Sequence, residues 1–282
     1  MLHRWDTKHN DLNIALLEVK RLSQKLIRKK EGRGRKPKHN LVKYAQLIFM
    51  KEFSDGISLR KAEVRLSEFV VGERVDHSVI AYWENKPEMA RLLNIILIRA
   101  GKLLKKLLSN LFTFVDATKF STWYMNEIQF HVCNVVAKET VYPIGISFLT
   151  GTVRGPTDEA TPPGSGKLYA DAGYDDNKTI GVLFGKGYVP IVCPNKGRWK
   201  GYWRKRARRL YRLGENRTGY RQRGRGESMF GSLTNEFGDR LHVRNGQSMQ
   251  ARVMGRVISY QIKLLIRVRG CCCLGYFLDT LL

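Results

Sequence analysis

Residues 111–120 read LFTFVDATKF, a short apolar run with one acidic residue, Asp116, inside it. A run of this length that is rich in aromatic and apolar residues predicts a buried strand. A carboxylate in the interior of such a strand is costly unless it has a partner. Asp116 is therefore either the cap of a turn or part of a site.

The residues that follow predict a hairpin and then alternating strands and helices. Residues 128–137 and 141–150 alternate well enough for two strands around the turn KET. The Gly- and Pro-rich stretch 151–166 is expected to form a loop. KLYADAGYDD then predicts a strand that ends at Asp171, NKTIGVLFGKG a helix, and YVPIVCP a further strand. This order predicts an α/β fold, a mixed sheet flanked by helices.

The N-terminal part of the chain is predicted to be all-α. Residues 11–30 have the pattern of an amphipathic helix, which ends at the basic segment EGRGRKPKHN (31–40). RGRKP resembles the core of an AT-hook, although a solvated linker is the simpler interpretation. From residue 41 to 100 the pattern is helical, with one helix expected over SLRKAEVRLSEF (58–69) and Ser58 as its N-cap.

A helix, a turn at Gly72 and a short helix capped by Asp76 and stopped by Pro87 are typical of a helix-turn-helix. Many small helical bundles with no DNA role share this pattern. The short helix would face its apolar residues inward and carry an outer face of His77, Ser78, Ala81, Tyr82 and Glu84. We expect three domains: residues 1–40 as N-terminal helix and basic linker, 41–108 as a helix-turn-helix-like DNA-binding domain, and 109–282 as the α/β domain.

The composition favours a polyanionic partner. Of 282 residues 43% are hydrophobic, enough for a buried core. The formal net charge is +25, from 50 Lys and Arg against 25 Asp and Glu. Because basic residues are interleaved with Tyr and Trp, nucleic acid is the preferred partner; a cationic surface that aids solubility and attraction to acidic lipid are the alternatives.

The cysteines and the hydropathy pattern favour a cytoplasmic protein. Five cysteines, three of them adjacent, form neither a zinc motif nor an even disulfide framework. No apolar run is long enough to cross a bilayer, and the N-terminus lacks the apolar centre of a secretory signal. We therefore expect no membrane partner and, with DNA as partner, association with the nucleoid.

Asp116, Asp171 and Glu227 are three acids whose surroundings disfavour a negative charge. Glu227 opens the helical stretch ESMFGSLTNEFG directly after the arginine-rich segment GYRQRGRG. Taken singly, each acid has an ordinary explanation as a cap, a turn residue or an N-terminal helix acid. Together they fit a divalent-cation site, since hard oxygen ligands suit Mg²⁺ or Mn²⁺. Two such ions about 4 Å apart support in-line displacement at a phosphate.

Residues 198–225 combine twelve Lys and Arg with one acid, Glu215, and several aromatic residues. Cations hold the nucleic-acid backbone, while aromatic rings stack on unpaired bases. A plain solvated basic helix explains the charge but not the aromatics. Trp199 and Trp203 are candidates to receive a flipped base, an idea that burial in the hydrophobic core would remove.

These residues resemble the prokaryotic insertion-sequence transposases whose domain carries the acids Asp, Asp and Glu (DDE). The third-acid motif of that family is Y-x2-R-x3-E-x6-K, and Tyr220, Arg223 and Glu227 match its first three elements. ADAGYDD, with Asp171, looks like the second-acid region, and Asp116 in FVDATKF matches the first acid.

The resemblance extends over roughly residues 110–270 and has one departure. Thr234 stands where the motif has lysine, so a hydroxyl replaces a charge that contacts phosphate in the family. The three carboxylates are all present. The helical N-terminus is similar only in general character.

The resemblance implies an RNase H-like catalytic domain at residues 109–282 and a DNA transposase that depends on Mg²⁺ or Mn²⁺. Such an enzyme hydrolyses a phosphodiester at the element's end, and the freed 3′-hydroxyl then attacks target DNA. Asp116, Asp171 and Glu227 would be the catalytic acids and ligands of two ions. The partners would be terminal inverted repeats, target DNA and a second copy of the chain. Residues expected to contact DNA are Tyr220, Arg223, Thr234, Arg221, Arg225, Trp199, Trp203, His77, Ser78 and Tyr82.

Two alternatives remain beside a transposase. One is a related nuclease or integrase that uses the same three acids. The other is a non-catalytic DNA-binding protein, a decayed transposase that acts through its helix-turn-helix.

Overall fold

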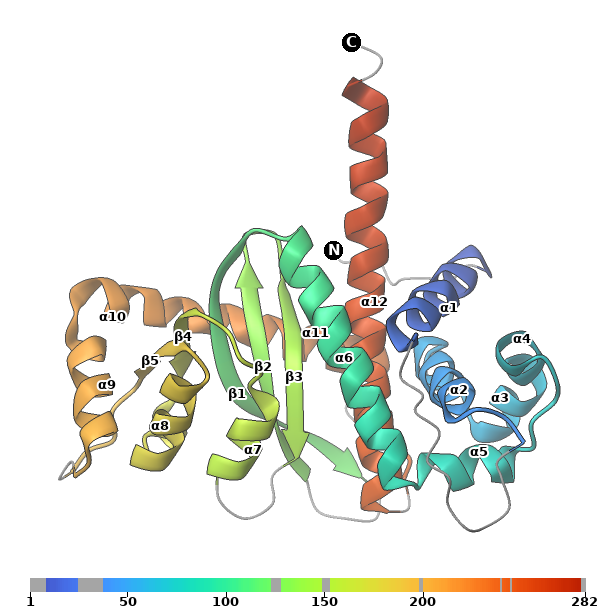
Figure 1. Cartoon of the computed structure of the whole chain (residues 1–282), viewed down its shortest axis with the longest axis horizontal. Helices are drawn as coiled ribbons and strands as arrows, with labels where there is room; N and C mark the ends of the chain where they lie inside the picture. Colours follow the sequence, from blue (N-terminus) through green and yellow to red (C-terminus); the bar gives the residue numbers. More distant parts are fainter. Residues whose placement is uncertain are drawn as a thin grey trace. The chain divides into compact units, whose positions relative to one another are not determined.

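The computed structural model of the chain describes residues 9–24, 38–122, 128–148, 153–197, 200–238, 240–243 and 245–279. The chain divides into two compact units (Figure 1). Unit 1 is Met1–Ala100 together with Glu236–Leu282, and unit 2 is Gly101–Asn235. Unit 1 is therefore discontinuous in sequence, since it combines both ends of the chain.

Unit 1 is built from helices. Its elements are α1 (His9–Ser23), α2 (Leu41–Phe53), α3 (Leu59–Arg65), α4 (Ser67–Val71), α5 (His77–Glu84), most of α6 (Pro87–Leu107), the two-residue strand β6 (Arg240–Leu241) and α12 (Gly246–Asp279). The side chains of Asn40, Ser58 and Asp76 accept backbone N–H bonds in the first turns of α2, α3 and α5. The caps expected at Ser58 and Asp76 are confirmed.

The helix expected over 58–69 is present as two helices, because the structure interrupts it at Leu66, directly after the end of α3. The helix α4 follows and ends at Gly72, whose φ of 95° lies in the left-handed region that favours glycine. Pro87 opens α6 directly after α5 has ended, a position where proline's missing N–H leaves no helical bond unmade.

A buried ionic network occupies the core of unit 1. Lys51, fully buried on α2, contacts Glu52 and lies 3.1 Å from Glu84 Oε1. Arg252 and Arg256 on α12 pair with the same glutamates, at 3.2 Å from Glu84 Oε1 and 3.4 Å from Glu52 Oε2. Burial raises the pKa of Glu52, but the three cations outweigh burial and hold it below its ordinary value of 4.5. Every charge in the network thus has a partner, and α2, α5 and α12 are connected through it.

The network corrects the predicted outer face of α5. Glu84 was expected outside with His77 and Tyr82, but its side chain is only 2% exposed. Its partners come from α2 and from α12, near the far end of the chain. Helical periodicity takes only neighbouring residues into account and gives no information on partners from distant parts of the chain. For this reason the prediction placed Glu84 on the wrong face.

Unit 2 contains a mixed β-sheet. Its strands are β1 (Asn110–Thr122), β2 (Ile128–Ala137), β3 (Val141–Phe148), β4 (Gly166–Ala170) and β5 (Tyr188–Val192), in the spatial order β3-β2-β1-β4-β5. The pairs β1–β2 and β2–β3 are antiparallel, whereas β1–β4 and β4–β5 are parallel. The predicted hairpin and the strand at 111–120 are confirmed.

The register of β1 decides which side chains share a face of the sheet. Phe114 is opposite Tyr169 of β4, and Val115 is opposite Ala170. Because side chains alternate along a strand, Phe114 and Asp116 lie on one face with Tyr169, and Val115 lies on the other. We call the face of Phe114 and Asp116 the acid face.

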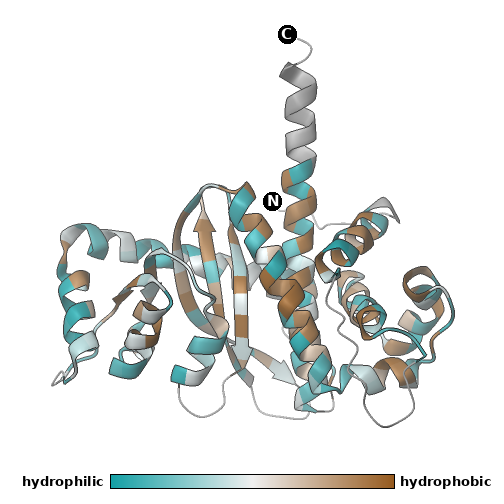
Figure 2. Cartoon of the chain, in the orientation of Figure 1, coloured by the Kyte–Doolittle hydropathy of each residue, from teal (hydrophilic) through white to brown (hydrophobic). Residues whose placement is uncertain are grey.

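Helices and turns of unit 2 are α7 (Arg154–Ala160), the 3₁₀ turn η1 (Ala172–Tyr174), α8 (Asn177–Gly185), α9 (Tyr202–Arg212), α10 (Gly214–Arg221), the 3₁₀ turn η2 (Gln222–Gly226) and most of α11 (Glu227–Phe237). Figure 2 shows hydrophobic residues along the strands and hydrophilic ones along α9. The loop expected over 151–166 is wrong in part, since α7 forms there. Pro156 lies in its first turn, where proline is tolerated.

The face of the sheet opposite the acid face is covered by an apolar core. Val115 from β1 packs there with residues from β4, β5, α8 and α9, and Tyr174 of η1 belongs to the same cluster. The mixed sheet flanked by helices and the helical N-terminal region confirm the predicted α/β fold class.

The compact units divide the chain differently from the domains expected at 1–40, 41–108 and 109–282, and those functional boundaries stay a prediction. The AT-hook-like RGRKP segment lies outside the described residues. In the part of the chain that the structure describes, no helix has the length and apolar character needed to cross a membrane.

Candidate active site

Asp116 lies in the middle of β1, on the acid face. Its side chain is 18% exposed, and its Oδ2 accepts a hydrogen bond from Arg223 Nη1 at 2.7 Å. Its Oδ1 accepts from the Ala117 N–H at 2.9 Å. The carboxylate predicted to need a partner thus has one, from the arginine-rich segment more than 100 positions later in the chain.

Asp171 directly follows β4, the parallel neighbour of β1. Val115 is opposite Ala170 in the register of the two strands. The next residues are Asp116, still in β1, and Asp171, whose backbone is extended, so their side chains point to the same face. Asp171 caps η1, and its Oδ1 accepts from the Gly173 N–H at 2.9 Å. Two of the three predicted acids therefore lie on the same face, one within β1 and one just after the neighbouring strand β4.

Glu227 is the first residue of α11 and is exposed. The residue before it, Gly226, is buried against the ring of Phe114, so closely that a Cβ at this position would overlap the ring. Only glycine lets η2 approach β1 this closely. This approach brings Glu227 near enough to Asp116 for its charge to act on that carboxyl group.

The electrostatics show that the three acids influence one another. Burial raises the pKa of Asp116 above its ordinary value of 3.8, and the charges of Asp171 and Glu227 raise it further, while Arg223 opposes them. Burial lowers the pKa of Arg223, but Asp116, Asp171 and Glu227 raise it, so the guanidinium stays charged. The charges of three carboxylates thus act on Arg223, which is paired with Asp116.

The oxygens of these acids are not all in mutual contact. Within the described residues, one group of three metal-ligating side chains has its atoms within 4.8 Å of one another, namely Glu63, Asp76 and His77 in unit 1. That group has internal partners, because Glu63 accepts from Arg74 Nη2 at 2.7 Å and from the His77 N–H at 3.1 Å. The acids of unit 2 therefore form a wider group than this.

Tyr220 and Arg223 are positioned by an aromatic cluster on the acid face. Tyr220 packs edge-on against Tyr169 and Tyr211, with ring centroids 6.2 and 5.3 Å apart. The guanidinium of Arg223 lies 5.8 Å from the Tyr220 ring. Burial raises the pKa of Tyr220, so its hydroxyl stays protonated. The first two residues of the predicted Y-x2-R-x3-E motif therefore lie beside the acid group.

The other residues expected to bind DNA near Glu227 are placed differently. Thr234 donates its hydroxyl to the carbonyls of Phe230 and Gly231 on its own helix, each at 3.1 Å. The Arg225 guanidinium donates to the carbonyls of Ala137 and Lys138. Arg221 is exposed.

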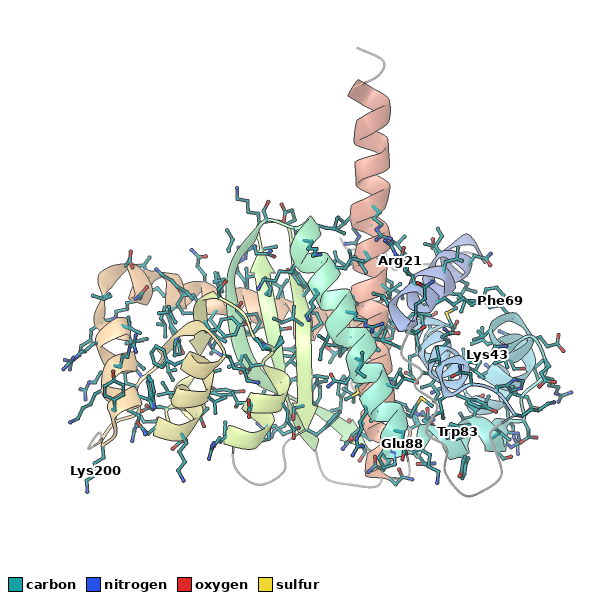
Figure 3. The ribbon with its side chains drawn as sticks, in the orientation of Figure 1. Arg21, Lys43, Phe69, Trp83, Glu88 and Lys200 are labelled. Carbon is teal, nitrogen blue, oxygen red and sulfur yellow. The ribbon has the colours of Figure 1, made fainter. Side chains whose placement is uncertain are left out.

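The basic helix α9 has an exposed and a packed side. Trp203 is half-buried and packs against the core, with its ring 5.0 Å from that of Phe184, whereas Tyr202 is 67% exposed. Its exposed cations are Lys205, Arg206, Arg209 and Arg212. Lys200, just before this helix, extends away from the ribbon in Figure 3. Trp199 lies outside the described residues.

The predicted recognition residues on α5 are accessible. Tyr82 is 54% exposed, with Lys86 Nζ 4.3 Å from its ring centroid. His77 and Ser78 make local hydrogen bonds to Glu63 and Asp76. Trp83, labelled in Figure 3, stacks on Tyr44 and forms the inner side of the helix.

Two further residues lie near the acid group. His131 was not singled out from the sequence, and Tyr174 was noted only as part of ADAGYDD, the stretch that looks like the second-acid region. His131 of β2 and Tyr174 of η1 are both 2% exposed, and Tyr174 Oη and His131 Nδ1 hydrogen-bond at 2.6 Å. Burial lowers the pKa of His131, and the charge of Asp171 opposes this. The only signals in the sequence are a histidine in an apolar strand and a tyrosine three positions after Asp171.

Comparison with known proteins finds a family match for part of the chain. Residues 127–262 match the family model described as "Transposase DDE domain". The matched range includes Asp171 and Glu227, whereas Asp116 precedes it. Neither the curated proteins nor the solved structures contain a match to the chain.

The match supports an insertion-sequence transposase with a DDE domain. The match supports the predicted family and the RNase H-like fold class, whereas the Y-x2-R-x3-E motif stays a prediction. A family of this kind implies a polynucleotidyl transferase type of enzyme that binds DNA and uses divalent metal ions.

Proposed function

We propose that the chain cleaves phosphodiester bonds at the ends of its element and joins the freed 3′-hydroxyl to target DNA, with Asp116, Asp171 and Glu227 as the catalytic acids. The observation that supports this most is the meeting of the three acids on one face of the sheet. Asp116 and Asp171 come from adjacent strands, and Glu227 arrives through the close contact of Gly226 with Phe114.

The three acids fit a divalent-cation site. All of them offer hard oxygen ligands. Burial raises the pKa of Asp116 despite the ion pair with Arg223, and the charges of Asp171 and Glu227 raise it further. Acids whose oxygens are not all in mutual contact are compatible with two ions, since ligands of different ions need not touch. When bound, Mg²⁺ or Mn²⁺ would neutralise the developing charge on the phosphate oxygens.

The side chains beside the acids supply the contacts that hold the DNA. Arg223 uses Nη1 for Asp116, and its guanidinium has further N–H donors that can reach a phosphate. Tyr220 remains protonated and can donate its hydroxyl. The Thr234 hydroxyl donates to a carbonyl within α11. Arg223 would therefore make the phosphate contact without help from a lysine at the last motif position.

The exposed cations of α9, together with Tyr202, form the surface that we propose contacts the element's end. Their positive charge provides sequence-independent affinity for phosphates, and this affinity falls as salt rises. Trp203 packs against the core, which leaves Tyr202 as the more accessible ring for base stacking. In unit 1 the accessible face of α5 would bind the terminal repeat, and two copies of the chain would pair two ends at the nucleoid.

The test is cleavage of labelled duplexes that carry the terminal repeats flanking the gene, in Mg²⁺. Asp171→Asn should reduce cleavage by about 1,000-fold or more, because a metal ligand contributes several kcal/mol to transition-state stabilisation. The control is Asp158→Asn, since Asp158 on α7 is exposed and pairs with Lys186. Its cleavage should match that of the native chain.

The other outcomes separate the alternatives. Unchanged cleavage by Asp171→Asn would refute the assignment of the acids. Cleavage without joining to a second duplex would indicate a nuclease. Binding of the repeats without cleavage by the native chain would indicate a decayed transposase.

A further inference from the structure

The His131–Tyr174 pair is buried on the side of the sheet opposite the acid face, and packing alone does not explain its polar groups. Both side chains are almost fully buried, and a hydrogen bond of 2.6 Å joins them. The other ring nitrogen of His131, Nε2, is buried and has no hydrogen-bond partner in the part of the chain that the structure describes. A buried polar atom without a partner is costly, so a core selected only for stability would favour an apolar residue here.

The register places this pair on the opposite face of the sheet from the acids. His131 is the partner of Ala117, one position after Asp116, so its ring points away from the acid face. Tyr174 lies in the apolar core together with Val115. The segment from Asp171 to Tyr174 therefore wraps around the end of β4, with its first side chain on the acid face and its last on the other.

The two ends of this segment are held by different bonds. At its start, Asp171 Oδ1 accepts from the Gly173 N–H at 2.9 Å. At its end, Tyr174 is bonded to His131 on β2, the strand adjacent to β1. A further bond, from Asn195 Nδ2 to the Ala172 carbonyl at 2.7 Å, ties the turn to residues beyond β5. Within the described residues, the bond to His131 is the side-chain hydrogen bond that joins this turn to β2, while the turn also continues directly from β4, which pairs with β1.

We propose that Tyr174 and His131 are a pair of positioning residues that fix the carboxylate of Asp171 relative to that of Asp116. This inference rests on the proposed function, in which both acids hold a divalent cation. A rigid turn keeps the two carboxylates at the spacing that the cation requires. Without the hydroxyl bond, the turn pivots on its remaining anchors and the spacing varies.

The experiment measures Mn²⁺ binding to the full chain without DNA, by calorimetry and by electron paramagnetic resonance. Tyr174→Phe keeps the ring in the core and removes the bond to His131. We expect its Mn²⁺ affinity to fall by about 10-fold, the lower end of the effect seen when partners that orient metal ligands are removed. His131→Leu should produce a similar loss, and the double variant should lose little more, because both changes remove the same bond.

Tyr188→Phe is the matched control. Tyr188 belongs to the same apolar cluster, is equally buried, and donates its hydroxyl to the Pro162 carbonyl at 3.1 Å, away from the acids. Loss of this hydroxyl in Tyr188→Phe should leave the Mn²⁺ affinity unchanged. Equal losses in Tyr188→Phe and Tyr174→Phe would overturn the proposal, since both would then reflect a general loosening of the core.

Asp171→Asn separates the failure of this inference from the failure of the proposed function. If Asp171→Asn binds Mn²⁺ as the native chain does, the proposed function fails. If Asp171→Asn loses binding while Tyr174→Phe and His131→Leu retain it, the positioning role alone is wrong. Should Tyr174→Phe not fold, hydrogen exchange at the Gly173 amide in folded His131→Leu decides: faster exchange than in the native chain supports the proposal, and unchanged exchange overturns it.

Discussion

The two units of the chain differ in how their charged clusters are balanced between positive and negative side chains. In unit 1, Lys51, Arg252 and Arg256 meet Glu52 and Glu84, and each charge has a partner of the opposite sign. In unit 2, three carboxylates share the neighbourhood of a single arginine, Arg223. The first arrangement is complete in itself and connects helices. The second has an excess of negative charge, which a cation from outside would balance.

The largest effect that can test this contrast is expected in unit 1. Lys51→Met would leave Glu52 and Glu84 with fewer cations in a fully buried site. Removing one partner of a buried ion pair costs about 3–5 kcal/mol, so the free energy of unfolding of unit 1 should fall by that amount. Hydrogen exchange followed by mass spectrometry on peptides of α2 and α12 measures it.

The control for this change is Lys167→Met. Lys167 pairs with Glu215 at 3.2 Å, but both side chains are largely exposed. An exposed pair contributes less than about 1 kcal/mol, so exchange in unit 2 should barely change. A similar loss in both variants would contradict the distinction between the network and surface pairs.

The two units should also respond to acid with opposite signs. The pKa of Glu52 is lowered in the folded state, so its contribution to stability is present above 4.5 and is lost as the pH falls through the folded pKa. The pKa of Asp116 is raised, so the folded state binds its proton more tightly, and this acid favours unfolding as the pH rises through 3.8 towards the folded value.

The measurement is hydrogen exchange of each unit between pH 6 and pH 3, corrected for the intrinsic rate. Acid should reduce protection in α2 and α12, and the variant Glu52→Gln should remove part of that pH dependence. Around β1, Asp116→Asn should make protection less dependent on pH. The sign of each slope decides the contrast: Glu52→Gln should lessen a rise of protection with pH, and Asp116→Asn should lessen a fall. Slope changes of the same sign in both variants would contradict it.

The smallest expected effect is that of Asp116→Asn on the stability of unit 2 at neutral pH. The change removes repulsion from Asp171 and Glu227, while the Asn carbonyl can still accept from Arg223. The free energy of unfolding should therefore stay within about 1 kcal/mol of the native value, as for most partly exposed sites. Chemical denaturation provides this value, and a loss of several kcal/mol would mean that the acid is structural.

The sequence was sufficient for features that depend on neighbouring residues. The strand around Asp116, the hairpin after it and the caps at Ser58 and Asp76 follow from local patterns, and the structure contains them. The acids could be singled out because a charge in an apolar strand and a glutamate after an arginine-rich loop contradict their surroundings. The spacing of Tyr220, Arg223 and Glu227 added a resemblance to a family.

The sequence was insufficient for features that depend on distant partners. Glu84 was expected outside because its partner Arg252 is far away in sequence. The helix α7 was missed because glycine and prolines in 151–166 indicate a loop, although Pro156 is tolerated in a first turn. The His131–Tyr174 bond requires the register of β2 against β1, which no local pattern provides.

The discontinuity of unit 1 has a consequence for synthesis on the ribosome. All of unit 2 has been translated once Asn235 is incorporated, whereas Arg252 and Arg256, which complete the ionic network, follow later. During that interval, the nascent chain holds Glu52 and Glu84 without their arginines. A product that terminates early would thus retain all three acids of the sheet and lack the helix that completes the N-terminal helical unit.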